Sequence, residues 1–209
     1  MVLASKKTPY DPQGDRPDVR DERAKFVRNQ LKLPPSRLVF LDESGCHPGI
    51  GPRRGWSLRG KPLFGPEQVY ARGRHVSMIA AMSLAGIQAL MTVRGGVKTP
   101  SFRAFVFNRW IPKLHPGDIV LWDNLNLHKR EEFRRAIKAV GAKLVQLPRY
   151  SPDLNPIEPA WGKVKAWIRK NQPKTVAQLR ELMRRALYRI RPSEARGWFK
   201  YCGYRLPAL

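Results

Sequence analysis

The chain has 209 residues, of which 40 are Lys or Arg and 16 are Asp or Glu, so its formal net charge is +24. This length suits one domain with a sizeable core. So large a positive charge indicates a polyanionic partner, most often nucleic acid, although composition also allows a basic protein without chemistry, such as a ribosomal-type protein. The only two cysteines, Cys46 and Cys202, lie far apart, which excludes a disulfide framework and gives no zinc-site spacing.

The start of the chain, MVLASKKTPYDPQG, contains no apolar leader segment. No apolar run approaches the length that spans a bilayer. We therefore expect a cytoplasmic protein that has no membrane partner.

Residues 1–36 are expected to form a linker or extension, with a possible short helix over Pro17–Gln30. A second part, residues 37–209, begins with an apolar run that ends at Asp42 and indicates a strand buried on both faces. Residues 45–75, rich in Gly, Pro and Arg, are predicted to form a loop with one or two short strands. The basic and aromatic residues of this loop suit either a DNA path or a solvated loop pinned to the core.

The remaining elements are predicted in chain order from apolar periodicity and turn residues. They are a hairpin of 75–83 and 86–94, a helix over 99–113 ended by Pro112, a strand over 118–122, a helix reaching Val140 with Gly141 after its end, a strand over 143–147, a helix from Pro156, and a last long helix from the cap Thr175 to Ile190. Three strands in succession followed by alternating helices and strands predict an α/β fold, with a mixed five-stranded sheet flanked by helices.

Three acids occupy comparable places in this pattern. Asp42 and Asp123 each end an apolar run, and Glu158 stands three residues after Asn155 at a predicted helix start. Glu158 alone would suit a capping-box acid. However, α/β folds place ligand sites at strand ends, where the three carboxylates could meet. Such a cluster requires either a protonated member or a bound cation, and carboxylate oxygens suit Mg²⁺ or Mn²⁺.

The strings that carry these acids resemble a known family. LVFLDES, IVLWDNLNLHK and YSPDLNPIEPAWGKVK resemble the DDE catalytic domain of mariner-like transposases, most closely the bacterial insertion-sequence branch. Between Asp123 and Glu158 lie 34 residues, the spacing typical of that branch. The resemblance extends over roughly residues 16–204. It implies a ribonuclease-H-like fold for residues 37–209 and a metal-dependent DNA endonuclease and strand transferase.

The resemblance also implies a metal content and partners. Two Mg²⁺ ions, replaceable by Mn²⁺, would be held by Asp42, which bridges both, and by Asp123 and Glu158, which hold one each. Transposon ends and target DNA would be the partners of a nucleoid-associated homodimer. The upstream helix-turn-helix region of the family is absent, so we expect either a truncated chain or a separately encoded DNA-binding region.

Other residues near the three acids are candidates for supporting roles, and for each of them a structural alternative stays open. They are Asn124 for orienting a ligand or phosphate, His128 for a phosphate contact or a helix start, Asn155 for shaping the turn that aims Glu158, and Arg149 and Tyr150 for DNA contacts or plain surface positions. Two other functions also fit the sequence: a catalytically silent DNA-binding remnant of a transposable element, and a ribonuclease-H-like nuclease of other purpose, such as a resolvase.

Overall fold

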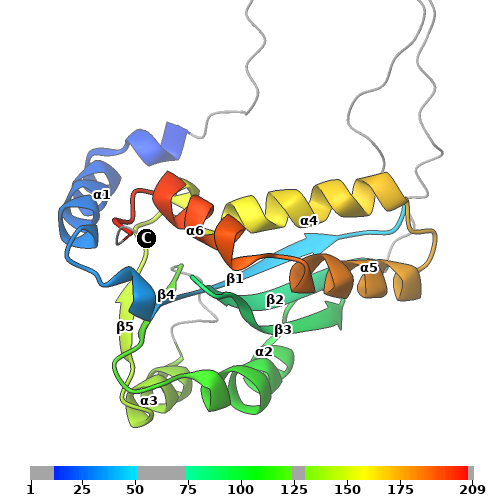
Figure 1. The fold of residues 1–209 in the computed structure, drawn as a ribbon, viewed down its shortest axis with the longest axis horizontal. Coiled ribbons are helices and arrows are strands. Elements are labelled where there is room, and N and C mark those ends of the chain that lie inside the picture. The colour runs from blue at the N-terminus through cyan, green and yellow to red at the C-terminus, as the bar shows by residue number, and fades with distance from the viewer. Residues whose placement is uncertain (1–11, 51–73, 124–129, 207–209) are drawn as a thin grey trace, which may run out of the picture.

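The structure, a computed structural model, describes residues 12–50, 74–123 and 130–206 (Figure 1). The strands are β1 (Leu38–Cys46), β2 (Val76–Ser83), β3 (Gly86–Arg94), β4 (Ile119–Trp122) and β5 (Lys143–Gln146). The α-helices are α1 (Pro17–Gln30), α2 (Thr99–Phe105), α3 (Glu131–Ala139), α4 (Ile157–Asn171), α5 (Val176–Tyr188) and α6 (Pro192–Tyr201). The short strands predicted within residues 51–73 lie outside the described residues.

The five strands form one mixed sheet in the order β3-β2-β1-β4-β5. β1, β2 and β3 pair antiparallel as a meander, whereas β4 and β5 join the other side of β1 in parallel. This arrangement confirms the predicted mixed five-stranded sheet with a three-strand meander.

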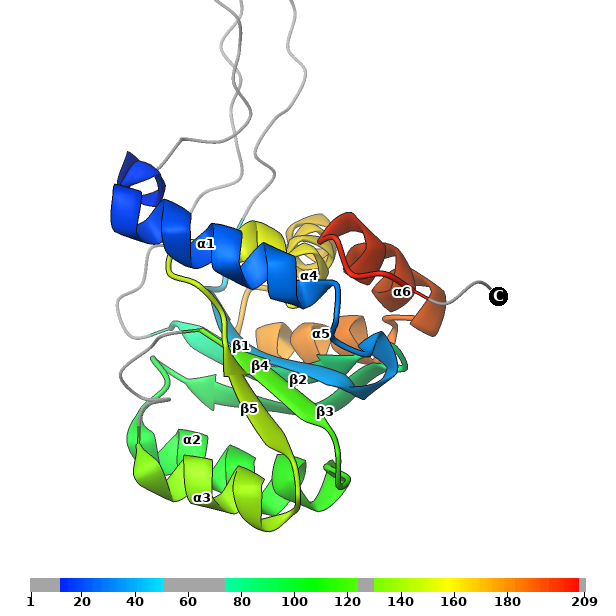
Figure 2. The same cartoon turned by 90° about the vertical axis from the view of Figure 1, so that its left-hand side faces the viewer.

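Helices cover both faces of the sheet: α4, α5 and α6 lie on one face, and α2 and α3 on the other (Figures 1 and 2). The alternation of side chains along β1 shows how one strand serves two cores. Leu38 and Phe40 belong to the core beneath α4–α6, whereas Val39 and Leu41 belong to the core over α2 and α3. By the same alternation, Asp42 faces α4.

Three helical segments differ from the sequence-based expectation. The helix predicted over 99–113 is α-helical only to Phe105, continues as a π-helical segment over Val106–Trp110, and ends in a 3₁₀ turn that contains Pro112. The last predicted helix, Thr175 to Ile190, corresponds to α5, and a further helix that was not predicted, α6, follows it with Pro192 in its first turn, where the missing N–H of proline leaves no hydrogen bond unmade. α4 begins one residue later than expected, at Ile157.

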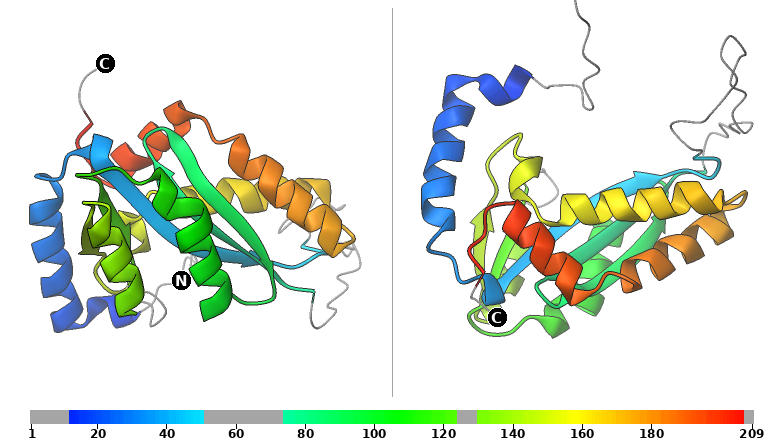
Figure 3. Two further views of the ribbon diagram at one scale, coloured as in Figure 1. Left: turned by 90° about the horizontal axis from the view of Figure 1, so that it is seen from below. Right: turned by 45° about the horizontal axis from the view of Figure 1, so that its top comes forward.

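Helix α1 lies at the β5 end of the sheet (Figure 3). A groove between the helix and the strand is lined by Phe26 and Leu33 on one side and Val145 on the other. At the C-terminal end of α1, the buried Gln30 donates a hydrogen bond of 2.7 Å to the carbonyl of Cys202. Thus the C-terminal end of α1, a helix predicted from a weak apolar pattern, is tied to the segment that follows α6. No helix in the described ranges is both long and apolar enough to cross a bilayer.

Candidate active site

The register of the two central parallel strands brings Asp42 to Asp123. β1 pairs with β4 from Leu38 opposite Ile119 to Phe40 opposite Leu121, and continuing this register by two residues sets Asp42 opposite Asp123. Asp42 does not end its strand, as the apolar run had suggested, because β1 continues to Cys46 by pairing with β2. The β1–β4 pairing nevertheless stops short of Asp42, which therefore lies at the edge of the parallel part of the sheet.

Glu158 reaches the same place from the first turn of α4. In a capping box, the carboxylate of Glu158 would accept a hydrogen bond from the backbone N–H of Asn155. That N–H donates instead to the carbonyl of Pro152 at 3.1 Å. The side-chain oxygen of Asn155 accepts from the N–H of Ile157 at 3.4 Å. Asn155 thus supports the helix start, and Glu158 is left free of a capping role.

Asp42, Asp123 and Glu158 line one cavity of about 440 Å³. Asp42 is buried, Asp123 is partly buried and Glu158 is exposed, so the solvent exposure of the three acids increases from the sheet to the mouth of the cavity. Arg149 and Tyr150 line the same cavity. The structure therefore brings the three predicted acids and two of the predicted DNA contacts to one opening, whereas Asn124 and His128 lie outside the described residues.

Both oxygens of the Asp42 carboxylate are held by protein donors. The indole N–H of Trp161 donates to Oδ2 at 2.9 Å, and the backbone N–H of Glu43 donates to Oδ1 at 2.8 Å. Burial, as the largest cause, and the charge of Glu158 nevertheless raise the pKa of Asp42 to about 8, against the lowering effect of Trp161. A carboxyl group with such a pKa stays largely protonated at neutral pH unless a cation stabilises its charge.

The charge repulsion extends across the cavity. The pKa of Glu158 is raised, first by desolvation of its carboxyl group and then by the charge of Asp123, while Lys165 opposes the shift. The charges of Glu158 and Asp123 therefore each affect the pKa of another acid of the cavity. Within the described residues, however, no group of three or more His, Cys, Asp or Glu side chains is placed so that it could hold a metal ion. The donor chemistry fits a divalent cation, and the carboxylates would have to draw together to ligate it.

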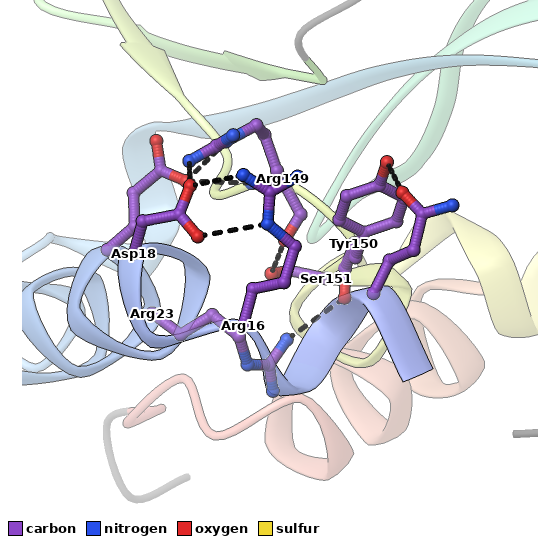
Figure 4. A network of polar contacts seen from close by, with 8 residues as sticks. Arg16, Asp18, Arg23, Arg149, Tyr150 and Ser151 are labelled. Carbon is purple, nitrogen blue, oxygen red and sulfur yellow. Dashed lines mark hydrogen bonds and ion pairs between the residues drawn. The ribbon is translucent and has the colours of Figure 1, made fainter. Parts of the chain in front are cut away.

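The turn between β5 and α4, which aims Glu158, is fastened to α1 by ion pairs in both directions, and Figure 4 shows the one between Arg149 and Asp18. Arg149 of the turn pairs with Asp18 at 2.8 Å and with Glu22 at 3.1 Å. In the opposite sense, Arg23 of α1 binds both carboxylate oxygens of Asp153 at 2.7 and 2.9 Å. The pKa of Asp153 is lowered, mainly by its hydrogen bond to Arg23. Helix α1 thus holds both ends of the turn.

The backbone of this turn is held from two further sides. Tyr150 has a φ of +52°, in the left-handed region that non-glycine residues rarely adopt. Its carbonyl accepts from Arg23 at 3.3 Å, and its hydroxyl donates to Gln13 (Figure 4). From the C-terminal segment, the buried Tyr204 hydroxyl donates to the carbonyl of Leu154 at 3.0 Å. These bonds stabilise the backbone that sets the direction of α4.

Two features of the site are absent from the sequence-based prediction. Trp161 was not among the predicted site residues, although it follows Glu158 by three residues and so projects from the same side of α4. That spacing was the available signal for its contact with Asp42. The pairing of α1 with the turn had no such signal, because more than 120 residues separate Asp18, Glu22 and Arg23 from their partners.

Comparisons with known proteins place this geometry in a family. The family model described as DDE superfamily endonuclease matches residues 37–180. The chain belongs to the DDE superfamily of endonucleases. The match contains Asp42, Asp123 and Glu158 and begins just before β1. No curated protein matches this DDE endonuclease by sequence.

Solved structures of Mos1 transposase share the fold. The Mos1 strand transfer complex has a TM-score of 0.72 and 15% identity, with 97% of this chain and 63% of that chain covered. The Mos1 catalytic domain with raltegravir and magnesium has a TM-score of 0.63 and 12% identity, covering 93% and 94%. The Mos1 mariner paired end complex with manganese gives 0.61 and 17%, covering 99% and 68%.

These likenesses confirm the ribonuclease-H-like fold of the DDE endonuclease. The chain spans less than two thirds of the Mos1 chain in the strand transfer complex.

Proposed function

We propose that this DDE endonuclease is the catalytic domain of a transposase, which cleaves DNA at transposon ends and joins the freed 3′-hydroxyl to target DNA. One observation carries the proposal: three carboxylates from β1, the end of β4 and the start of α4 line a single cavity, and burial together with mutual repulsion raises the pKa of two of them. Such an arrangement is costly for a protein that only binds DNA. The Mos1 structures, which include a strand transfer complex and paired end complexes with Mg and Mn, support the same function.

In the proposed site, Asp42, Asp123 and Glu158 would hold two Mg²⁺ ions, for which Mn²⁺ can substitute. When bound, the ions would activate the attacking hydroxyl or water and stabilise charge on the scissile phosphate. Asp42 is the proposed bridging ligand, because it is the most buried of the three and its carboxyl group is fixed by two donors. Trp161 orients that carboxylate, and Asn155 keeps Glu158 at the first turn of α4.

Arg149 and Tyr150 are the proposed DNA contacts at the mouth of the cavity. A guanidinium group binds phosphate oxygens with the same fork of donors that Arg149 presents to Asp18 and Glu22. Asn124 and His128 remain proposed contacts to a ligand or phosphate. The proposed partners are transposon ends, target DNA, a second copy of the chain in the DNA complex and a separately encoded DNA-binding region, all at the bacterial nucleoid in the cytoplasm.

A strand-transfer assay tests this function. A labelled oligonucleotide with a free 3′-hydroxyl is incubated with plasmid and Mn²⁺, together with either the wild-type chain or Glu158→Gln. A transposase joins the oligonucleotide to the plasmid, and the substitution abolishes joining because it removes a metal ligand. Nicking of the plasmid without joining would favour a nuclease of another purpose, and joining by both proteins would refute the role of Glu158.

A further inference from the structure

A second concave surface is lined by α4 and by the segment that joins α5 to α6. We call it the α4–α6 groove, and its volume is about 920 Å³. Its lining contains four basic side chains and one acid: Lys163, Lys170, Arg189, Arg191 and Glu194. None of these residues belongs to the carboxylate cavity.

The acid in the groove is already neutralised. Glu194 binds Lys163 at 2.6 Å, and its pKa is lowered by a hydrogen bond from the backbone of Arg191 and then by Lys163. Lys170 and Arg189 form no ion pair with a carboxylate in the parts of the chain that the structure describes. The groove therefore presents uncompensated positive charge to solvent.

Aromatic side chains lie among these cations. The guanidinium of Arg189 lies 5.0 Å from the centre of the Trp167 ring, which stabilises its position in the groove wall by a cation–π contact. Tyr188, at the last position of α5, leaves 69% of its surface exposed. Positive charge beside an exposed aromatic ring such as that of Tyr188 is typical of surfaces that follow a nucleic-acid backbone.

The groove and the carboxylate cavity are both lined by residues of α4. Glu158 lies in the first turn of α4, and Lys163 and Lys170 follow it by five and twelve residues. At 1.5 Å per residue these positions lie about 8 and 18 Å farther along the axis. A DNA duplex that leaves the cavity along α4 would cover this distance in about five base pairs.

We propose that the α4–α6 groove binds the phosphate backbone of duplex DNA beside the segment that is cut. The occupant is identified by charge complementarity and by the shared helix. The inference rests on the proposed function for the identity of the DNA in the cavity, but it concerns a separate surface. Lys170 and Arg191 contact phosphates, and Tyr188 packs its exposed ring against the sugar or a base.

Fluorescence anisotropy with a labelled duplex, measured over a series of salt concentrations, tests the groove. The full-length wild-type chain is compared with Lys170→Glu/Arg191→Glu, and with the control Lys138→Glu/Lys143→Glu, which makes the same charge change on α3 and β5. We expect the groove variant to flatten the slope of log affinity against log salt by about 2, one unit for each lost phosphate contact. The control should change the slope by less than half as much. Tyr188→Ala should weaken binding without changing the slope, because it removes no charge.

A second experiment uses only the wild-type chain, so its result does not depend on whether a variant folds. The lysines are acetylated with and without DNA, and the extent of acetylation at each lysine is measured by mass spectrometry. DNA should protect Lys163 and Lys170 severalfold and leave Lys138 reactive. Equal slopes for the groove variant and the control, or unprotected groove lysines, would overturn the inference. Protection by poly-glutamate as strong as protection by DNA would assign the groove to an acidic polypeptide instead.

Plasmid nicking in Mn²⁺ separates this inference from the proposed function. A chain that binds DNA through the groove but never nicks would contradict the proposed function and keep the groove. If the wild-type chain nicks the plasmid and the groove variant binds DNA with an unchanged salt slope, the proposed function would be supported and the groove would be contradicted. Failure of the wild-type chain to bind DNA at all would overturn both.

Discussion

Asp42→Asn should make the metal-free protein more stable near pH 8. The pKa of Asp42 is raised from 3.8 to about 8 by burial and by the charge of Glu158, so the folded protein binds this proton more tightly than the unfolded chain. The contribution of Asp42 is therefore greatest below about pH 4 and is lost as the pH rises to about 8. Asn carries no charge at either pH and avoids this loss.

The size of the effect follows from the shift. About four pKa units correspond to roughly 5 kcal/mol of stability lost by the wild type between about pH 4 and about pH 8. The amide keeps one acceptor oxygen for the donors Trp161 and Glu43, so the variant loses one hydrogen bond, which costs about 1–2 kcal/mol. The expected balance is a variant about 3–4 kcal/mol more stable near pH 8 and about 1–2 kcal/mol less stable near pH 4.

Urea unfolding followed by circular dichroism in EDTA, at a series of pH values, measures this difference. Asp153→Asn is the matched control, because the pKa of Asp153 is lowered by Arg23, so that substitution should destabilise the protein at neutral and higher pH. An Asp42→Asn variant that is less stable than the wild type near pH 8 would refute the account of a buried, repelled carboxylate. So would a stability difference that does not change with pH.

Three further predictions concern the same site and one helix end. Mg²⁺ or Mn²⁺ at a hundred times its dissociation constant should stabilise the wild type against urea by about 2.7 kcal/mol and leave Asp42→Asn unchanged; equal stabilisation of both would place the ion elsewhere. Trp161→Phe removes a donor that lowers the pKa of Asp42, so the pH at which wild-type stability falls should move upward, and a downward movement would contradict the hydrogen bond. Gly141→Ala should cost about 1–2 kcal/mol in urea unfolding, because Gly141 has a φ of +74° and an added Cβ would lie 3.2 Å from Pro116; an unchanged midpoint would contradict this strain.

The fold was predictable from the sequence where local patterns and tertiary structure agree. The β2–β3 hairpin follows from two apolar runs separated at Ala85-Gly86, and Gly141 has the positive φ expected just after a helix. The order of strands and helices along the chain predicted the mixed sheet. Helix α6 was not predicted, although it had a local signal, since Pro192 followed two residues later by Glu194 is typical of a helix start.

The candidate site was predictable at the level of the three acids and of Asn155, whereas the contacts that fasten its turn to α1 were not. Strand ends and a helix start can be located from apolar runs and turn residues. By contrast, the fastening of the turn to α1 through Arg149 and Arg23 depends on side chains that meet only after folding. The position of Asp42 within β1 also depended on β2, which extends β1 beyond its pairing with β4.

The most direct test of the central claim is nicking of supercoiled plasmid in Mn²⁺ by the wild-type chain and by Asp123→Ala, with DNA binding measured in parallel. The account predicts that the wild type nicks, and that Asp123→Ala binds DNA equally well but does not nick. Equal nicking by the two proteins would contradict the assignment of the carboxylate cavity as the catalytic metal site.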